Sequence, residues 1–142
     1  MSLSPCFGQE VLHFDFNEDQ YATMALDKIS NKSISINNHF NRPERINASF
    51  GKALRLDGWS TYATSNEITL SGITNEFTFE TWHATESFNQ KEAALLDYTE
   101  NSNDLYIAIG PYGNVIFTTK INGLRKQLKS KSNIKAYIWN HI

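Results

Sequence analysis

The sequence has little cysteine, no long apolar run and no excess of positive charge, and each absence excludes a class of protein. A single cysteine, Cys6, in 142 residues leaves no internal disulfide framework. No run approaches the roughly 18 apolar residues of a membrane-spanning helix. Thirteen Lys and Arg against fifteen Asp and Glu give a net charge of −2, which excludes the electrostatic footprint of a nucleic-acid-binding protein. The composition therefore indicates an ordinary soluble globular protein.

The first nine residues are distinct from the rest, so we assign 1–9 to a leader or signal-peptide remnant and 10–142 to one domain. Met1-Ser2-Leu3 is typical of a leader, and Ser4 to Gln9 resembles the tail of a secretory signal. Leu3, three residues before Cys6, leaves lipidation of the cysteine open beside the signal remnant. We expect a secreted, periplasmic or cell-surface protein, and a tail without any role is the alternative.

Apolar and polar residues alternate along most of the chain, which predicts strands. The predicted strands are 11–16, 32–36, 53–57, 61–64, 67–70, 76–83, 93–98, 105–109, 115–120, 124–129 and 137–142. Residues 17–30 are expected to be mostly loop, and 37–50 a long irregular connection of the kind that often carries a function. Gly110 to Asn114 and Asn122-Gly123 are typical hairpin turns. The pattern predicts an all-β, antiparallel, two-sheet sandwich.

Two carboxylates in one predicted strand suggest acid catalysis, because glycoside hydrolysis needs a pair of acids. Glu76 and Glu80 share a strand face. Some jelly-roll glucanases carry their acids in the pattern Glu-x-Asp-x-x-Glu. Here Thr78 and Thr81 occupy the second and third acid positions, so the pattern is broken. Polar strand positions are the favoured interpretation.

Metal sites are weakly indicated. Asp27 and Asp57 are candidate calcium ligands, since loop carboxylates bind calcium in many sandwiches. Asp57 precedes Gly58, however, and a turn aspartate that bonds its own backbone is the simpler interpretation. The four histidines lack the short spacing of a zinc site. We expect no cofactor other than calcium.

Aromatic side chains are the candidate sugar contacts, because the C–H faces of a sugar ring pack against aromatic rings. Trp59, Tyr62 and Tyr112 are predicted to bind carbohydrate, and the first and last of these lie at turns. Trp82, which shares a predicted strand with Phe77 and Phe79, is expected in the core. The basic cluster of residues 125–131 favours a solvated edge strand over a phosphate or heparin site.

Residues 53–82 resemble laminin-G-like domains of the concanavalin A-like lectin and glucanase superfamily. The resemblance is carried by Ala53-Leu54-Arg55-Leu56-Asp57-Gly58-Trp59-Ser60-Thr61-Tyr62 and Phe77-Thr78-Phe79-Glu80-Thr81-Trp82, and it continues at 93–96, 105–110, 121–123 and Trp139-Asn140-His141-Ile142. The sequence is especially similar to the N-terminal module of some bacterial family 32 glycoside hydrolases, the β-fructosidases. The likeness covers about residues 10–142 and implies a jelly roll.

The resemblance implies a non-catalytic carbohydrate-binding or supporting module of an exported bacterial glycoside hydrolase. Its partners would be carbohydrate, fructan included, and the catalytic domain of the parent enzyme. The fructosidase motifs Asn-Asp-Pro, Arg-Asp-Pro and Glu-Cys are absent, so we do not expect this chain to be an enzyme by itself. An adhesion or protein-interaction module of the same fold is the alternative. A small glucanase-like hydrolase is disfavoured by the broken acid pattern.

Domains of this family continue beyond the Trp139 to Ile142 segment, so a sandwich truncated at its C-terminus is expected. Truncation would leave a strand edge or an apolar face exposed. A homodimer, an exchange of strands or an early closure of the fold would cover it.

Overall fold

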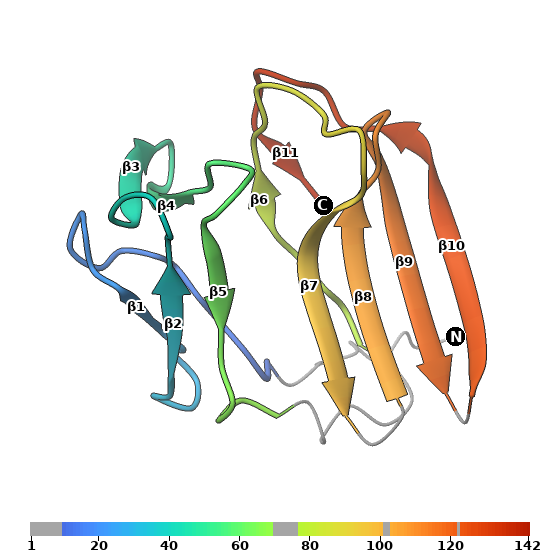
Figure 1. The fold of residues 1–142 in the computed structure, drawn as a ribbon, viewed down its shortest axis with the longest axis horizontal. Helices are drawn as coiled ribbons and strands as arrows, with labels where there is room; N and C mark the ends of the chain where they lie inside the picture. Colours follow the sequence, from blue (N-terminus) through green and yellow to red (C-terminus); the bar gives the residue numbers. More distant parts are fainter. Residues whose placement is uncertain (1–9, 70–76, 101–102, 122) are drawn as a thin grey trace, which may run out of the picture. The chain divides into compact units, whose positions relative to one another are not determined.

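The protein is built from β-strands, turns and loops. The computed structural model describes residues 10–69, 77–100, 103–121 and 123–142. All strand pairs in this part of the chain are antiparallel, and no helix occurs there, so the all-β antiparallel prediction is confirmed (Figure 1). Nothing in the described ranges could cross a membrane as a helix. The chain divides into two compact units, residues 1–77 and 78–142.

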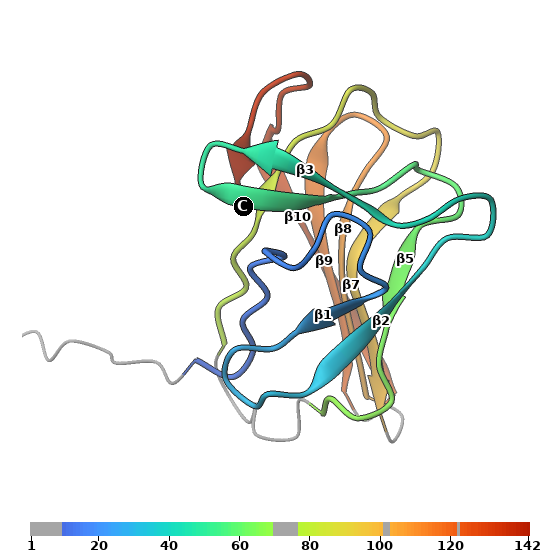
Figure 2. The same ribbon diagram turned by 90° about the vertical axis from the view of Figure 1, so that its left-hand side faces the viewer.

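The first unit contains a small sheet and a hairpin. Its strands are β1 (Met24–Leu26), β2 (Ser33–Asn37), β3 (Glu44–Ala48), β4 (Gly51–Arg55) and β5 (Tyr62–Thr64). The sheet has the order β1-β2-β5, and β3 pairs with β4 as a hairpin (Figure 2). Ala25 and Ile36, one on each of two paired strands, are buried.

A buried arginine joins the hairpin to the chain that leads into β1. Arg45 on β3 is only 3% exposed. Its guanidinium donates hydrogen bonds to the carbonyls of Ala22 and Met24, the second at 2.8 Å, and lies 3.2 Å from the Glu18 carboxylate. The two terminal nitrogens of the guanidinium are thus paired, which makes burial of the charge possible, while Nε is buried without a partner among the described residues. This network fixes β3 against residues 18–24.

The second unit is dominated by one sheet. Its strands are β6 (Trp82–His83), β7 (Ala93–Glu100), β8 (Asn103–Ile109), β9 (Asn114–Ile121), β10 (Leu124–Asn133) and β11 (Asn140–His141). Strands β7 to β10 form the sheet in the order β10-β9-β8-β7, and β11 pairs with β6. The core of this unit includes Ile107, Ala108, Ile109 and Ile116, all from the two central strands.

Both predicted glycine turns are present in this sheet. Gly113 has φ +82°, and a Cβ there would lie 2.8 Å from the Phe88 ring and 2.9 Å from the Ile134 carbonyl oxygen. Gly123 has φ +80° and open space around it. Ile121 pairs with Leu124, as a two-residue turn requires. Asn122 of that turn lies outside the described residues.

The predicted strand positions are wrong in several places. Residues 11–16 form no strand. Among the described residues, only the backbone of His13 in this range bonds the segment 27–28, through its N–H to Asp27 Oδ1 and its carbonyl to the N–H of Lys28. Conversely, β1 and β3 lie in segments expected to be loops, where strand pairing overrides weak local preference. Residues 67–69 and 77–81 are not strand, and the expected 137–142 is reduced to two residues. Leu70 and Glu76 of the predicted strands lie outside the described ranges.

Trp82 is also not where the sequence places it. Its side chain is half exposed instead of belonging to the core. The indole stacks on the His141 ring with centroids 4.9 Å apart, across the pairing of β6 with β11. Two-residue strands make a narrow ladder that covers only one side of a large ring, which explains the exposure.

Candidate functional site

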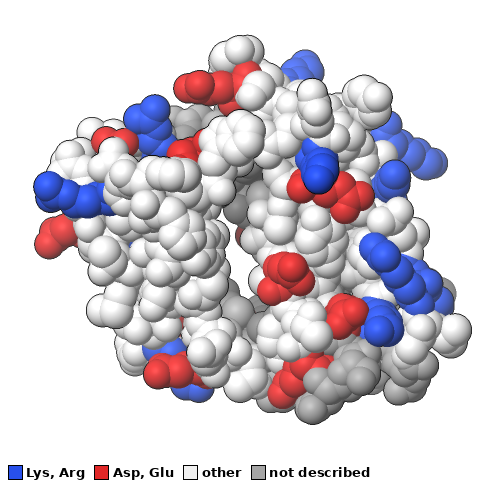
Figure 3. Space-filling view, in the orientation of Figure 1, with Lys and Arg blue, Asp and Glu red and all other residues white. Residues whose placement is uncertain are grey.

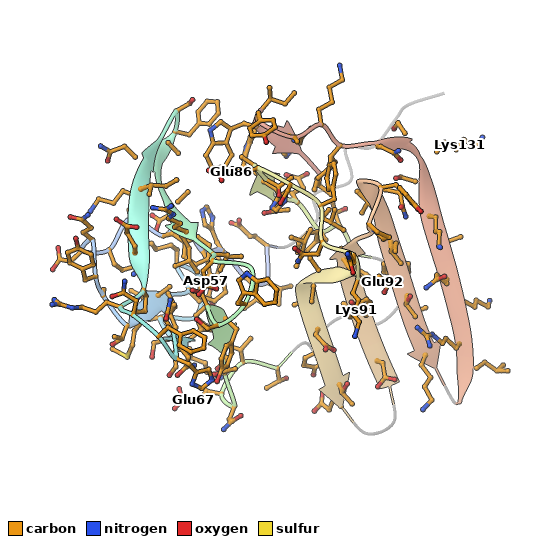
Figure 4. The ribbon with its side chains drawn as sticks, turned by 45° about the horizontal axis from the view of Figure 1, so that its top comes forward. Asp57, Glu67, Glu86, Lys91, Glu92 and Lys131 are labelled. Carbon is orange, nitrogen blue, oxygen red and sulfur yellow. The ribbon has the colours of Figure 1, made fainter. Side chains whose placement is uncertain are left out.

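The loop that follows β4 is closed on the carboxylate of Asp57 (Figure 4). Oδ1 of Asp57 accepts backbone N–H groups from Trp59 at 3.0 Å and from Ser60 and Thr61 at 2.8 Å each. Oδ2 accepts the Ser60 hydroxyl, and Gly58 takes the positive φ of 76° that the turn requires. The Ser60 hydroxyl and these N–H groups hold the pKa of Asp57 well below its usual range. The ionised side chain therefore fixes the backbone around Trp59.

A second polar residue joins this loop to the one that follows β2. Asn38 Oδ1 accepts the backbone N–H groups of Phe40 at 2.9 Å and Asn41 at 2.6 Å. The Asn38 side chain also donates to Thr61 Oγ1 at 2.8 Å, and its Oδ1 lies 3.2 Å from the buried Ser60 hydroxyl. Both loops thus belong to one hydrogen-bonded network.

The two loops present aromatic rings to solvent. Trp59 is 93% exposed and Phe40 is 85% exposed, while Tyr62 at the start of β5 is partly exposed. The His39 and Tyr62 rings lie 5.7 Å apart. We call His39, Phe40, Trp59 and Tyr62 the aromatic loop surface. Large apolar side chains held in solvent by an ordered backbone are more typical of a binding surface than of a fold requirement.

Tyr112 belongs to the second unit, on the turn between β8 and β9, and is 79% exposed. It borders a hollow of about 540 Å³, which we call the Tyr112 hollow. The other lining residues are Gln90, Lys91, Glu92, Pro111, Asn114, Ile116 and Lys129. This volume lies within the range of about 300 to 1,000 Å³ that is usual for small-molecule sites.

The predicted sugar contacts therefore lie on two separately described surfaces. Trp59 and Tyr62 both lie in the first unit, beside the loop that follows β2. Tyr62 pairs with Asn37, and its neighbour Thr61 accepts a hydrogen bond from Asn38. Tyr112 contributes to the hollow of the second unit. The role of all three in binding carbohydrate stays a prediction.

The calcium candidates have other partners. Asp27 accepts backbone N–H groups from His13, Ile29 and Ser30, and the Ser30 hydroxyl as well. Asp57 is engaged in the same way. Within the described ranges, no three His, Cys, Asp or Glu side chains are grouped as metal ligands. Calcium at either aspartate would have to replace several of these hydrogen bonds, and it stays a prediction.

The catalytic pair considered from the sequence cannot be placed, because Glu76 lies outside the described residues. Glu80 lies 3.8 Å from the His141 ring, and both side chains are largely exposed. The prediction that this chain is not an enzyme by itself stays a prediction.

Sequence reasoning missed several residues of these surfaces. His39 and Phe40 fall in the Asn-rich stretch 37–50, where the only signal was the length of the loop. Lys91 gives no signal, and Asn114 is indicated only as part of a hairpin turn; the fold brings them to one hollow from distant parts of the chain. For Lys129 the sequence predicts only a place in the edge strand.

No family model and no curated protein matches this sequence. Among solved structures, the fold is similar to that of an S-layer domain-containing protein, residues 221–444, from Clostridium thermocellum, with a TM-score of 0.68. The sequences are 17% identical, and the likeness covers 92% of this chain. The chain spans 61% of that structure. At this identity the comparison establishes the likeness in fold alone.

Proposed function

We propose that this chain is a non-catalytic carbohydrate-binding module with a concanavalin A-like jelly-roll sandwich, and that the aromatic loop surface contacts the sugar. The observation that carries the proposal is the exposure of Trp59 and Phe40 on loops fixed by Asp57 and Asn38. Indole and phenyl faces pack against the C–H groups of a sugar ring. The hydroxyl of Tyr62 and the His39 ring supply polar partners for sugar hydroxyls.

Preorganisation supports sugar binding at this surface. The backbone at Trp59 is held by three N–H bonds to one carboxylate, so little backbone freedom remains to be lost on binding. Sugars bind weakly per contact, and a fixed aromatic platform reduces the entropic cost of association.

The resemblance to β-fructosidase modules extends the proposal to the parent protein. We infer an exported bacterial glycoside hydrolase, in which this module positions fructan or another glycan for a separate catalytic domain. An extracellular location agrees with the leader-like residues 1–9.

An adhesion or protein-interaction module is the second candidate, and Phe40 is the observation that favours it. A phenyl ring that is 85% exposed has no polar atom of its own and suits an apolar protein surface as well as a sugar face. The polar network under Trp59 favours the sugar.

Calorimetric titration with levan, inulin and a panel of neutral oligosaccharides tests the proposal. Trp59→Ala should weaken binding at least tenfold, which corresponds to about 1.4 kcal/mol. Phe50→Ala is the matched control, since Phe50 is another exposed aromatic residue of the first unit, on the turn between β3 and β4. That variant should bind as the parent does.

Two results would contradict the proposal. One is the absence of binding to every glycan by a folded protein. The other is equal loss of affinity in the Trp59 and Phe50 variants, which would indicate a general effect on the unit instead of contact with the ligand.

A further inference from the structure

The Tyr112 hollow contains hydrogen-bond donors without partners. The Nδ2 atom of Asn114 is buried and has no hydrogen-bond partner among the described residues. Lys91 and Lys129 both line the hollow, and among the described residues their ammonium groups have neither an ion pair nor a hydrogen bond. A buried amide that lacks a partner destabilises the protein unless a ligand or water satisfies it. The hollow thus offers two positive charges, and the unpartnered Asn114 amide is buried in its wall.

The strand register extends this positive character along the same face of the sheet. Ile116, Thr118 and Lys120 of β9 pair with Lys129, Gln127 and Arg125 of β10. Alternate residues of a strand share a face, so Gln127 and Arg125 continue the face on which Lys129 lines the hollow. Figure 3 shows basic side chains over β9 and β10 and acidic ones over β7 and β8.

The hollow is also lined by one carboxylate, that of Glu92. Figure 4 shows Glu92 beside Lys91 where the chain enters β7. Burial raises the pKa of the Tyr106 hydroxyl, and the nearby carboxylates of Glu92 and Asp97 raise it further. Tyr106 therefore adds no negative charge beside Glu92, and the lining of the hollow keeps two positive charges against one carboxylate.

We propose that the Tyr112 hollow binds the carboxylate-bearing sugar of an acidic saccharide, and that the saccharide continues along β10 over Gln127 and Arg125. Lys91 and Lys129 hold the carboxylate, and the exposed Tyr112 ring packs against the sugar face. This inference goes beyond the proposed function, because it assigns a separate site for acidic glycans to the second unit.

The rest of the chain argues for a saccharide over another polyanion. The net charge of −2 and the acidic half of the same face, which includes Asp97 and Asp104, would repel a long nucleic acid. A single carboxylate in a small hollow avoids that repulsion. An aromatic platform beside cationic donors matches a ring that carries one charge at its edge.

Binding of uronate trisaccharides (galacturonate, glucuronate and mannuronate), each beside its methyl ester, tests the inference by calorimetry on the full chain. At least one acid should bind, and its neutral ester should bind at least tenfold more weakly. Lys129→Ala and Tyr112→Ala should each weaken binding at least fivefold. Lys126→Ala is the matched control, because Lys126 pairs with Thr119 on the opposite face of β10, and it should change affinity less than twofold.

Three results would overturn the inference: no uronate binds, ester and acid bind equally, or Lys126→Ala has the effect of Lys129→Ala. Equal binding of polyphosphate would also overturn it, since it would indicate simple ion exchange. Circular dichroism checks folding, and Lys129→Gln replaces Lys129→Ala if that variant does not fold. Loss of neutral-glycan binding in Trp59→Ala tests the proposed function separately, so either idea can fail while the other stands.

Discussion

The Arg45 and Arg55 side chains offer a paired test of what burial does to an ion pair. Both belong to the hairpin of β3 and β4, and both contact a glutamate at nearly the same distance, 3.2 Å for Arg45–Glu18 and 3.1 Å for Arg55–Glu44. They differ in environment, because the Arg45 side chain is fully buried and that of Arg55 is 62% exposed. We compare Arg45→Ala with Arg55→Ala.

The structure gives each substitution a different expected effect on the free energy of unfolding. Arg45→Ala removes the guanidinium bonds to two carbonyls and to Glu18 and leaves those acceptors without their donor. Breaking a buried pair in this way costs about 3 to 5 kcal/mol. Arg55→Ala removes a solvent-screened pair, and such pairs contribute about 0 to 1 kcal/mol. The expected difference between the two variants is therefore at least about 2 kcal/mol.

Urea unfolding followed by circular dichroism measures both values. A loss below about 1 kcal/mol in Arg45→Ala would refute the reasoning, because it would mean that the buried charge contributes no more than an exposed one. Glu18→Gln gives an independent check. It keeps the two carbonyl bonds and should cost about 1.5 to 3 kcal/mol, the range for a hydrogen bond to a charged group.

Three further outcomes are expected. Gly113→Ala should lower the free energy of unfolding by about 2 to 4 kcal/mol, because the added Cβ meets Phe88 and Ile134 at positive φ. Gly123→Ala, at nearly the same φ but with open space around it, should lower it by about 1 to 2 kcal/mol. Melting curves of both variants measure the difference. Asp57→Asn should weaken neutral-glycan binding without affecting uronate binding, which calorimetry on both ligands checks. Burial raises the pKa of Asp27, but hydrogen bonds from Ser30, His13 and Ile29 outweigh burial, so the pKa is lowered from the usual 3.8. The stability that the ionised Asp27 contributes is therefore present above about pH 4 and is lost on acidification. The gap in urea midpoint between the parent and Asp27→Asn should therefore shrink at low pH, and a constant gap would contradict the assignment.

The sequence predicted those strands whose local signals agree with one another. The strands β7 to β10 alternate clearly and are separated by Gly110 to Asn114 and by Asn122-Gly123, so pattern and turn chemistry both point to hairpins. β1 and β3 have no such agreement, since their residues form strands only when a partner strand is present. The same reason explains why 11–16, with good alternation but no partner strand among the described residues, form no strand.

The sequence by itself determined the all-β class, the main hairpins, the turn role of Asp57 and the candidacy of Trp59, because each depends on neighbours along the chain. Only the tertiary structure decided that Asn38 joins the Asp57 loop to the loop of Phe40, and that Lys91, Asn114 and Lys129 line one hollow. These groupings depend on strand register, and register is fixed by pairing between segments distant in sequence. The aromatic candidates can therefore be identified from the local sequence, whereas the polar and basic side chains near them become neighbours only after folding.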